Sequence, residues 1–145
     1  MSIFNSLKPY LPIAGEAVSW PPQHARLFIG GPLPGMNELI DEAKKGKGKG
    51  NGYARLKKAW TDSIAIVAKT SRLPRFERAR LSFRWFERGR RRDPDNVAAG
   101  GRKLILDGLV VAKVLPGDGW AHVAGWTDSF EVGPRAGVEV TIEAA

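Results

Sequence analysis

Residues 79–111 have the sequence ARLSFRWFERGRRRDPDNVAAGGRKLILDGLVV, and this stretch decides the fold. Over Ala79–Phe86, apolar and polar side chains alternate, which is typical of a strand with one buried face. Asp93 and Pro94 mark the beginning of a helix, because aspartate is favoured at the capping position and proline at the first helical position. Apolar residues at helical spacing then predict a helix as far as about Val114. The centre of the domain is therefore predicted to be a strand joined to a helix by a basic loop.

The segments on either side of this stretch complete a small mixed domain. Tyr53–Thr70 has apolar residues at three- and four-residue steps, which predicts an amphipathic helix. Strands are predicted at Arg26–Ile29, at Val123–Val132 and over residues 138–142, and Met36–Lys44 is predicted to be a weak short helix or turn. The order β-α-β-α-β-β predicts an α+β fold, a single domain in which a small mixed β-sheet is covered by two helices.

The distribution of proline divides the chain. Residues 1–34 hold six of the ten prolines, so we expect a Pro-rich N-terminal arm or lead-in there, followed by the domain proper over residues 35–145. The chain has no cysteine, which excludes disulfides and thiolate metal sites. It also has no run of about 18 apolar residues, the length that a membrane span needs. We therefore expect a soluble, cytoplasmic protein without a membrane partner.

Positive charge is concentrated in two windows of the sequence. The 145 residues carry a net charge of +8. Residues 44–58 contain seven basic and no acidic side chains, and residues 72–92 contain nine arginines and two glutamates, so each window is +7 and the remainder of the chain is −6. A single basic run is usually a solvated face. Two in one small domain favour a surface that binds a polyanion, of which nucleic acid is the commonest.

Three aspartates, Asp93, Asp95 and Asp118, are the acidic residues of most chemical interest, because they lie in basic surroundings. Clustered carboxylates can hold Mg²⁺ or Mn²⁺, which neutralises phosphate charge and activates water for phosphodiester hydrolysis. Taken singly, each aspartate is better explained by structure, since Asp93 and Asp95 suit a helix beginning and Asp118 suits a Gly-Asp-Gly turn. The D-x-D spacing alone is therefore a weak indication of a metal site.

A longer pattern is much more specific. The chain contains Arg-Arg-Asp93-Pro-Asp95-Asn96, then Lys103, then Asp107-Gly108-Leu109, and then Leu-Pro-Gly-Asp118-Gly. Over residues 79–120 this combination resembles the RusA family of Holliday junction resolvases, which are found widely in phages and prophages.

The resemblance implies a metal-dependent endonuclease that hydrolyses phosphodiesters in branched DNA, with Mg²⁺ as cofactor and Mn²⁺ as a possible substitute. Matched residue by residue, Asp93, Asp95 and Asp118 correspond to the metal-binding carboxylates of the family. Lys103 corresponds to the active-site lysine when the match is anchored on Asp107. The resemblance also implies a homodimer that nicks opposing strands of a four-way junction symmetrically, in a bacterial or phage-infected cell. An apolar sheet edge and the 79–86 strand are the possible dimer surfaces.

The glycine pair at 100–101 leaves two structures open for the predicted helix. In a continuous helix, Lys103 lies about 12 Å along the axis from Asp95, and Asp107, about 18 Å away, pairs with Lys103 instead of sharing a metal with Asp95. Alternatively, the glycines form a loop and the helix begins again near Arg102, which brings Lys103 back to the site. The glycines favour the loop, since each weakens a helix by about 1 kcal/mol relative to alanine.

Basic side chains on either side of the site are expected to hold the DNA backbone, which gives affinity without base reading. These residues are Lys45, Lys47, Lys49, Arg90, Arg91 and Arg92, together with Asn96, which matches the asparagine after the second aspartate of the family pattern. Trp120 and Trp126 are candidates to stack on unpaired bases, whereas Trp60 and Trp85 suit the core. The alternative function is a non-catalytic basic nucleic-acid-binding protein in which the aspartates only cap helices and form turns.

Overall fold

The computed structural model describes residues 23–45 and 52–145, so Lys47 and Lys49 lie outside the described residues. In chain order the elements are β1 (His24–Gly30), α2 (Met36–Lys45), α3 (Gly52–Thr70), β2 (Ala79–Glu87), α4 (Pro94–Val111), β3 (Val123–Val132) and β4 (Gly137–Ala144). Within these residues the fold is a single α+β domain with a four-stranded mixed sheet, which confirms the predicted fold class.

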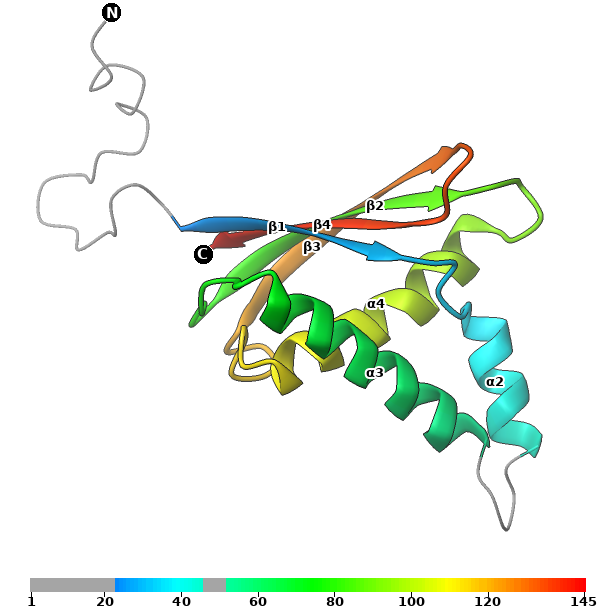
Figure 1. The fold of residues 1–145 in the computed structure, drawn as a ribbon, viewed down its shortest axis with the longest axis horizontal. Coiled ribbons are helices and arrows are strands. Elements are labelled where there is room, and N and C mark those ends of the chain that lie inside the picture. Colours follow the sequence, from blue (N-terminus) through cyan, green and yellow to red (C-terminus); the bar gives the residue numbers. More distant parts are fainter. Residues whose placement is uncertain (1–22, 46–51) are drawn as a thin grey trace, which may run out of the picture.

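The four strands are arranged in the order β1-β4-β2-β3. β2 pairs in parallel with β3 and antiparallel with β4, whose other edge pairs antiparallel with β1. The helices lie on one face of this sheet, with α3 and α4 beneath the strands and α2 towards one end (Figure 1). Because β2 is an interior strand, the predicted 79–86 strand has no edge with which to form a dimer, and β3 is left at the edge of the sheet.

One prediction for the N-terminal part differs from the structure. β1 pairs with β4 along its whole length, so the domain includes residues before 35 and the predicted boundary at residue 34 is misplaced. The strand predicted at Arg26–Ile29 is present within β1, where the buried side chains of Leu27 and Ile29 alternate with more exposed neighbours. Of the two forms predicted for Met36–Lys44, a short helix or a turn, the structure has the helix, which is ten residues long and buries Leu39.

The core lies between the sheet and the helices. Alternate residues of β2 and β4 face the helices. α4 is buried around most of its circumference, because it packs against the sheet, α2 and α3. The largest fully buried side chains of the core include Trp85, Phe83, Leu81, Ile64, Leu104, Ile105, Leu109 and Ile142. The core position predicted for Trp85 is confirmed, whereas Trp60 is only partly buried against the core.

α4 continues without a break through Gly100 and Gly101, so the loop that the glycine pair favoured is wrong. A Cβ atom at Gly100 would lie 2.5 Å from the backbone of Gly35, and one at Gly101 would lie 2.6 Å from the ring of Trp85. The glycines therefore let another part of the chain approach the helix closely, and the packing that this permits offsets their low helix propensity.

α4 ends at Val111, slightly before the predicted end near Val114. Lys113 has a left-handed φ of 62°, and the Val114 N–H donates to the Leu109 carbonyl at 2.9 Å, which closes the end of the helix. The turns that follow, over residues 112–122, carry Asp118 and Trp120.

Candidate active site

Asp93 and Asp95 lie at the beginning of α4 with exposed side chains. Asp93 occupies the capping position with extended backbone angles (φ −66°, ψ 146°), as predicted, but its side chain makes no capping hydrogen bond. Asp95 lies in the first turn, where the helix dipole favours negative charge. Capping therefore does not account for the Asp93 carboxylate, which remains open to a ligand.

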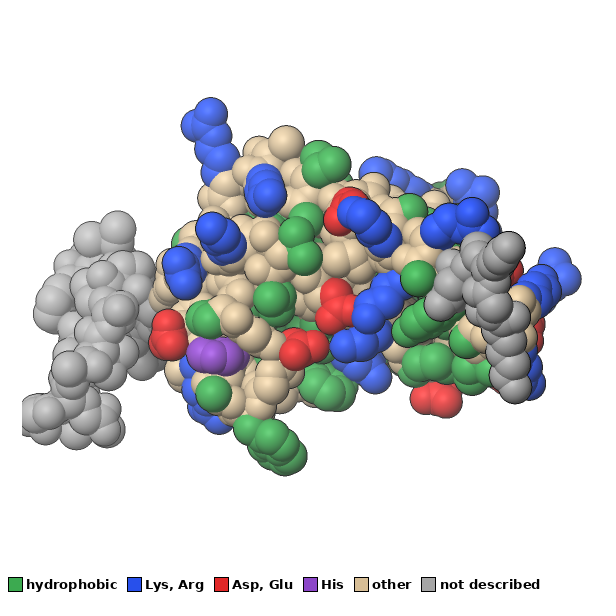
Figure 2. Space-filling model, turned by 90° about the horizontal axis from the view of Figure 1, so that it is seen from below, with side chains coloured by type: hydrophobic (Ala, Val, Ile, Leu, Met, Phe, Trp, Pro, Cys, Tyr) green, Lys and Arg blue, Asp and Glu red, His purple; other side chains and the backbone are tan. Residues whose placement is uncertain are grey.

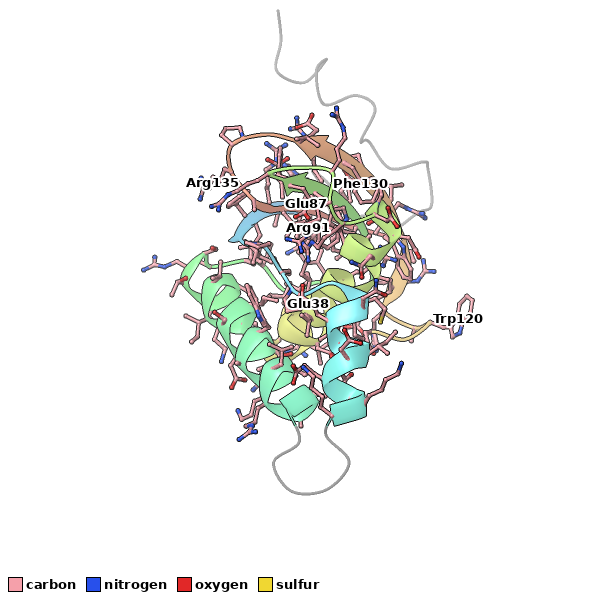
Figure 3. The ribbon with its side chains drawn as sticks, turned by 90° about the vertical axis from the view of Figure 1, so that its right-hand side faces the viewer. Glu38, Glu87, Arg91, Trp120, Phe130 and Arg135 are labelled. Atoms are coloured by element: carbon pink, nitrogen blue, oxygen red, sulfur yellow. The ribbon has the colours of Figure 1, made fainter. Side chains whose placement is uncertain are left out.

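The three arginines that precede Asp93 do not share one role. Arg92 forms a two-point ion pair with Glu87, with Nε–Oε1 and Nη2–Oε2 distances of 2.8 and 2.9 Å, and donates from Nη1 to the Leu33 carbonyl at 2.8 Å. The hydrogen bonds to Glu87 outweigh partial burial and raise the pKa of Arg92 above its ordinary value. Arg92 therefore anchors the loop, while Arg90 and Arg91 are exposed. Figure 3 shows Arg91 on the side of the molecule that faces the viewer, close to Glu87.

The remaining described residues predicted to bind DNA lie on or against α2. The Asn96 side-chain oxygen accepts a hydrogen bond from the Asn37 backbone N–H at 2.7 Å, so Asn96 caps the beginning of α2 from another helix. Lys45 lies at the exposed end of α2 and approaches Glu42 at 3.7 Å. Lys45 is thus available to a polyanion, whereas the Asn96 oxygen is already bonded.

Two of the predicted catalytic residues lie together: Lys103, in the middle of α4, and Asp118, in the turns after the helix end. The Lys103 ammonium is 3.2 Å from Asp107 Oδ1 and 3.6 Å from Asp118 Oδ2. The predicted i,i+4 pair of Lys103 and Asp107 is therefore confirmed. Partial burial opposes the charge of Lys103, but the hydrogen bond and charge of Asp107 and the charge of Asp118 outweigh it and raise the pKa of Lys103 above its ordinary value.

A hollow of about 570 Å³ adjoins this pair, between α3 and α4. Lys57 of α3 lies on its wall and places its ammonium 3.5 Å from Asp107 Oδ2. Figure 2 shows this helical face, on which acidic and basic side chains adjoin one another. The arrangement holds two carboxylates between two lysines, so the charges within it are largely balanced.

The predicted metal site of three aspartates does not form within one chain. Asp95 is followed by sixteen more residues of α4, about 24 Å of helix, before the turn that carries Asp118. In Figure 1 the two ends of α4 lie at opposite sides of the molecule. Within residues 23–45 and 52–145, no group of three acidic or histidine side chains is placed to hold a metal ion. The aspartates of a single chain therefore do not fit a shared divalent metal.

Two hollows lie at opposite ends of the edge strand β3. The first, of about 260 Å³, is lined by Asp93, Val97, Phe130 and Val132, and we call it the Asp93 hollow. The second, of about 370 Å³, is lined by Asp118, Trp120, Ala124 and Trp126, and we call it the tryptophan hollow. β3 exposes apolar side chains at both ends, since Trp126, Phe130 and Val132, which line the hollows, are each 41–51% exposed. The three residues between Trp126 and Phe130 are polar, so the exposed apolar surface of this edge strand is confined to the two hollows.

A polar network inside the protein orients the middle of β3. The indole N–H of buried Trp85 donates to Asp128 Oδ1 at 2.9 Å, and Arg102 donates to Asp128 Oδ2 at 2.7 Å. The Arg102 guanidinium then lies over the Trp126 ring, 4.8 Å from its centroid. A bulge near Gly125 shifts the register with β2 and turns Trp126 and Asp128 towards the helices.

The ion-pair partners of Arg92, Asp107 and Arg102 were not predicted from the sequence. Glu87, Lys57 and Asp128 each form an ion pair with a residue of the motif region. The isolated charge of Glu87 at the end of an otherwise basic strand was a usable signal for an internal ion pair. Lys57 and Asp128 are far from their partners in sequence and carried no local signal.

No family model matches the chain, and a search of the curated proteins finds no relative. In the part of the chain that the structure describes, no helix is both long and apolar enough to cross a bilayer.

Proposed function

We propose that the protein is an endonuclease that hydrolyses phosphodiesters in branched DNA, similar to RusA resolvases, and that it acts as a homodimer with Mg²⁺ as cofactor. Its place of action would be the cytoplasm of a bacterial or phage-infected cell. The observation that carries this proposal is the 3.6 Å approach of Lys103 to Asp118, two motif residues separated by a helix end and a turn. The separation of these two residues in the sequence gives no reason to expect that they lie so close together.

The geometry of β3 supports a site shared between two copies. Antiparallel pairing of β3 with β3 of a second copy, about a two-fold axis, places opposite ends of the strand side by side. The Asp93 hollow of one subunit then adjoins the tryptophan hollow of the other. Asp93 and Asp95 would meet Asp118 of the partner subunit, and each dimer would carry two such sites. This arrangement accounts for three motif aspartates that remain apart in one chain.

The protein groups around this site have separate roles in the proposal. Arg90 and Arg91, both exposed, hold the phosphate backbone by charge. Lys103 offers the positive charge of its ammonium, which ordinary lysine also carries at neutral pH, to the departing oxygen rather than acting as a base. Lys45 extends the basic surface along α2. Mg²⁺ would supply charge neutralisation at the scissile phosphate when bound by the carboxylates.

A non-catalytic nucleic-acid-binding protein is the second candidate function. One observation favours it: among the described side chains, acidic residues do not form a three-ligand group within the chain. In that case Asp93 and Asp95 serve only the beginning of α4, and basic residues provide all of the binding energy.

A cleavage assay on a synthetic four-way junction separates the two functions. We expect wild-type protein to nick the junction with Mg²⁺ and not with EDTA. The Asp95→Asn variant should bind the junction normally and lose cleavage by about 100-fold or more. Asp62→Asn is the control for the loss of one carboxylate charge, because Asp62 lies on another helix, α3, and pairs only with Lys58, at 2.6 Å, among the described residues. Junction binding without cleavage in Mg²⁺ or Mn²⁺ would reject the nuclease and favour the second candidate.

A further inference from the structure

Trp120 is the most exposed large hydrophobic side chain among the described residues, with 97% of its surface open to solvent. It lies two residues after Asp118, on the turn between α4 and β3, and Figure 3 shows it projecting away from the body of the protein. An indole offers a large apolar face, which water solvates poorly. A side chain of this kind at full exposure indicates a surface that is covered in a complex.

Trp126, on the wall of the same hollow, is held in place from behind. Its ring stacks against Arg102, whose guanidinium is fixed by Asp128, and Asp128 is fixed in turn by buried Trp85. The ring itself stays 47% exposed. Trp126 is therefore a pre-organised aromatic platform that loses little conformational entropy when a flat ligand stacks on it.

The space beside these rings suits one planar group. The tryptophan hollow measures about 370 Å³, which is near the lower end of small-ligand pockets. Gly119 and Gly125 line it and contribute no side chain, so the space stays open. Arg80 approaches Gly125, with Nη1 3.2 Å from the position that a Cβ atom would take. Arg80 thus supplies positive charge beside the aromatic walls, whereas the charge of Arg102 is already paired with Asp128.

We propose that the tryptophan hollow binds an unstacked nucleobase of branched DNA, held between Trp120 and Trp126, next to the phosphate that Asp118 approaches. The assignment rests on the proposed function. A nucleobase has the flat heteroaromatic face that indoles stack on, and the phosphate of the same nucleotide complements the positive charge of Arg80. Bases at a branch point are the least costly to extrude, because their stacking is already interrupted. The hollow therefore selects for unpaired bases at the junction centre.

The test compares binding to two four-way junctions in EDTA, so that no cleavage is needed. One junction carries normal bases at its branch point, and the other carries abasic sites there. We expect wild-type protein to bind the normal junction about tenfold more tightly. Trp120→Ala should abolish this preference and Trp120→Phe should retain most of it. Ile66→Ala, which removes another exposed apolar side chain, should retain all of it (Ile66 is 61% exposed).

The outcomes distinguish this inference from the proposed function. An equal preference in wild-type and Trp120→Ala would overturn the nucleobase site, even if the protein cleaves junctions. A base preference that depends on Trp120, in a protein that never cleaves, would support the site and reject the nuclease. If Trp120→Ala weakens dimerisation in sedimentation experiments and leaves base preference intact, Trp120 contacts the second copy and the nucleobase site is wrong.

Discussion

Lys103 joins two parts of the motif that the sequence places far apart. Its ammonium lies between Asp107 on its own helix and Asp118 beyond the helix end. Asp107 Oδ2 is buried without a hydrogen-bond partner among the described residues, and it approaches only the Lys57 ammonium, at 3.5 Å. Lys103 therefore stabilises the largely buried Asp107 carboxylate, which burial would otherwise penalise, and also attracts the more exposed Asp118. Its structural role and its proposed catalytic role use the same positive charge.

The raised pKa of Lys103 gives its stabilising effect a defined pH dependence. A raised folded-state pKa means that the contribution is complete below the ordinary lysine value of 10.5 and is lost as pH rises through the higher folded value. We expect Lys103→Met to lower the free energy of unfolding by about 1 kcal/mol or less at pH 7, because the group is half exposed. Urea titrations of both proteins over the alkaline range should show the difference shrinking as pH rises. A difference that grows with pH would contradict this account.

At the scale of elements, the sequence predicted most of the fold and only part of the site. Period-two alternation located β2, and helical spacing located α3 and α4, because each buries one regular face. The loop predicted at the glycine pair 100–101 is absent. The two glycines are needed because the 33–36 segment and β2 approach the helix closely there, and no local sequence pattern reveals such an approach. The separation of Asp95 from Asp118 follows from the unbroken helix, so it was missed for the same reason.

Gly100→Ala tests this explanation of the glycine pair. Helix propensity alone predicts that alanine stabilises α4 by about 1 kcal/mol. The structure predicts the opposite sign, since the new Cβ atom would meet backbone atoms of Gly35 and Met36 that cannot move separately. We expect a loss of about 1–3 kcal/mol in the free energy of unfolding, measured by urea denaturation. A more stable Gly100→Ala variant would show that the close approach is not needed.

At the scale of the whole molecule, β3 determines what the protein can assemble into. An edge strand of ten residues with exposed apolar side chains invites pairing with another strand. In the proposed antiparallel dimer, the two hollows at its ends would bring together groups that one chain keeps apart. The +8 charge would then serve a two-fold protein on the proposed two-fold DNA substrate.

Phe130→Arg tests the assembly directly. Phe130 is 41% exposed on β3, so the variant should fold while a charged side chain replaces an apolar one on the strand that is proposed to pair. We expect sedimentation velocity to show a dimer for wild-type protein and a monomer for the variant, with loss of junction cleavage. Ile66→Arg places the same charge on α3 and should remain dimeric. A dimer that survives Phe130→Arg would place the interface elsewhere.

The central claim, a nuclease site shared between two copies, is tested most directly by mixing two inactive variants. Asp95→Asn and Asp118→Asn are prepared separately, combined so that subunits exchange, and assayed on a four-way junction with Mg²⁺. If the site is shared, each mixed dimer carries one site with both aspartates intact, and nicking returns to about a quarter of the wild-type rate. If each site lies within one chain, every site lacks one aspartate and the mixture stays as inactive as its components. Recovery of nicking is the result we predict, and a wild-type protein that nicks while the mixture does not would contradict the account.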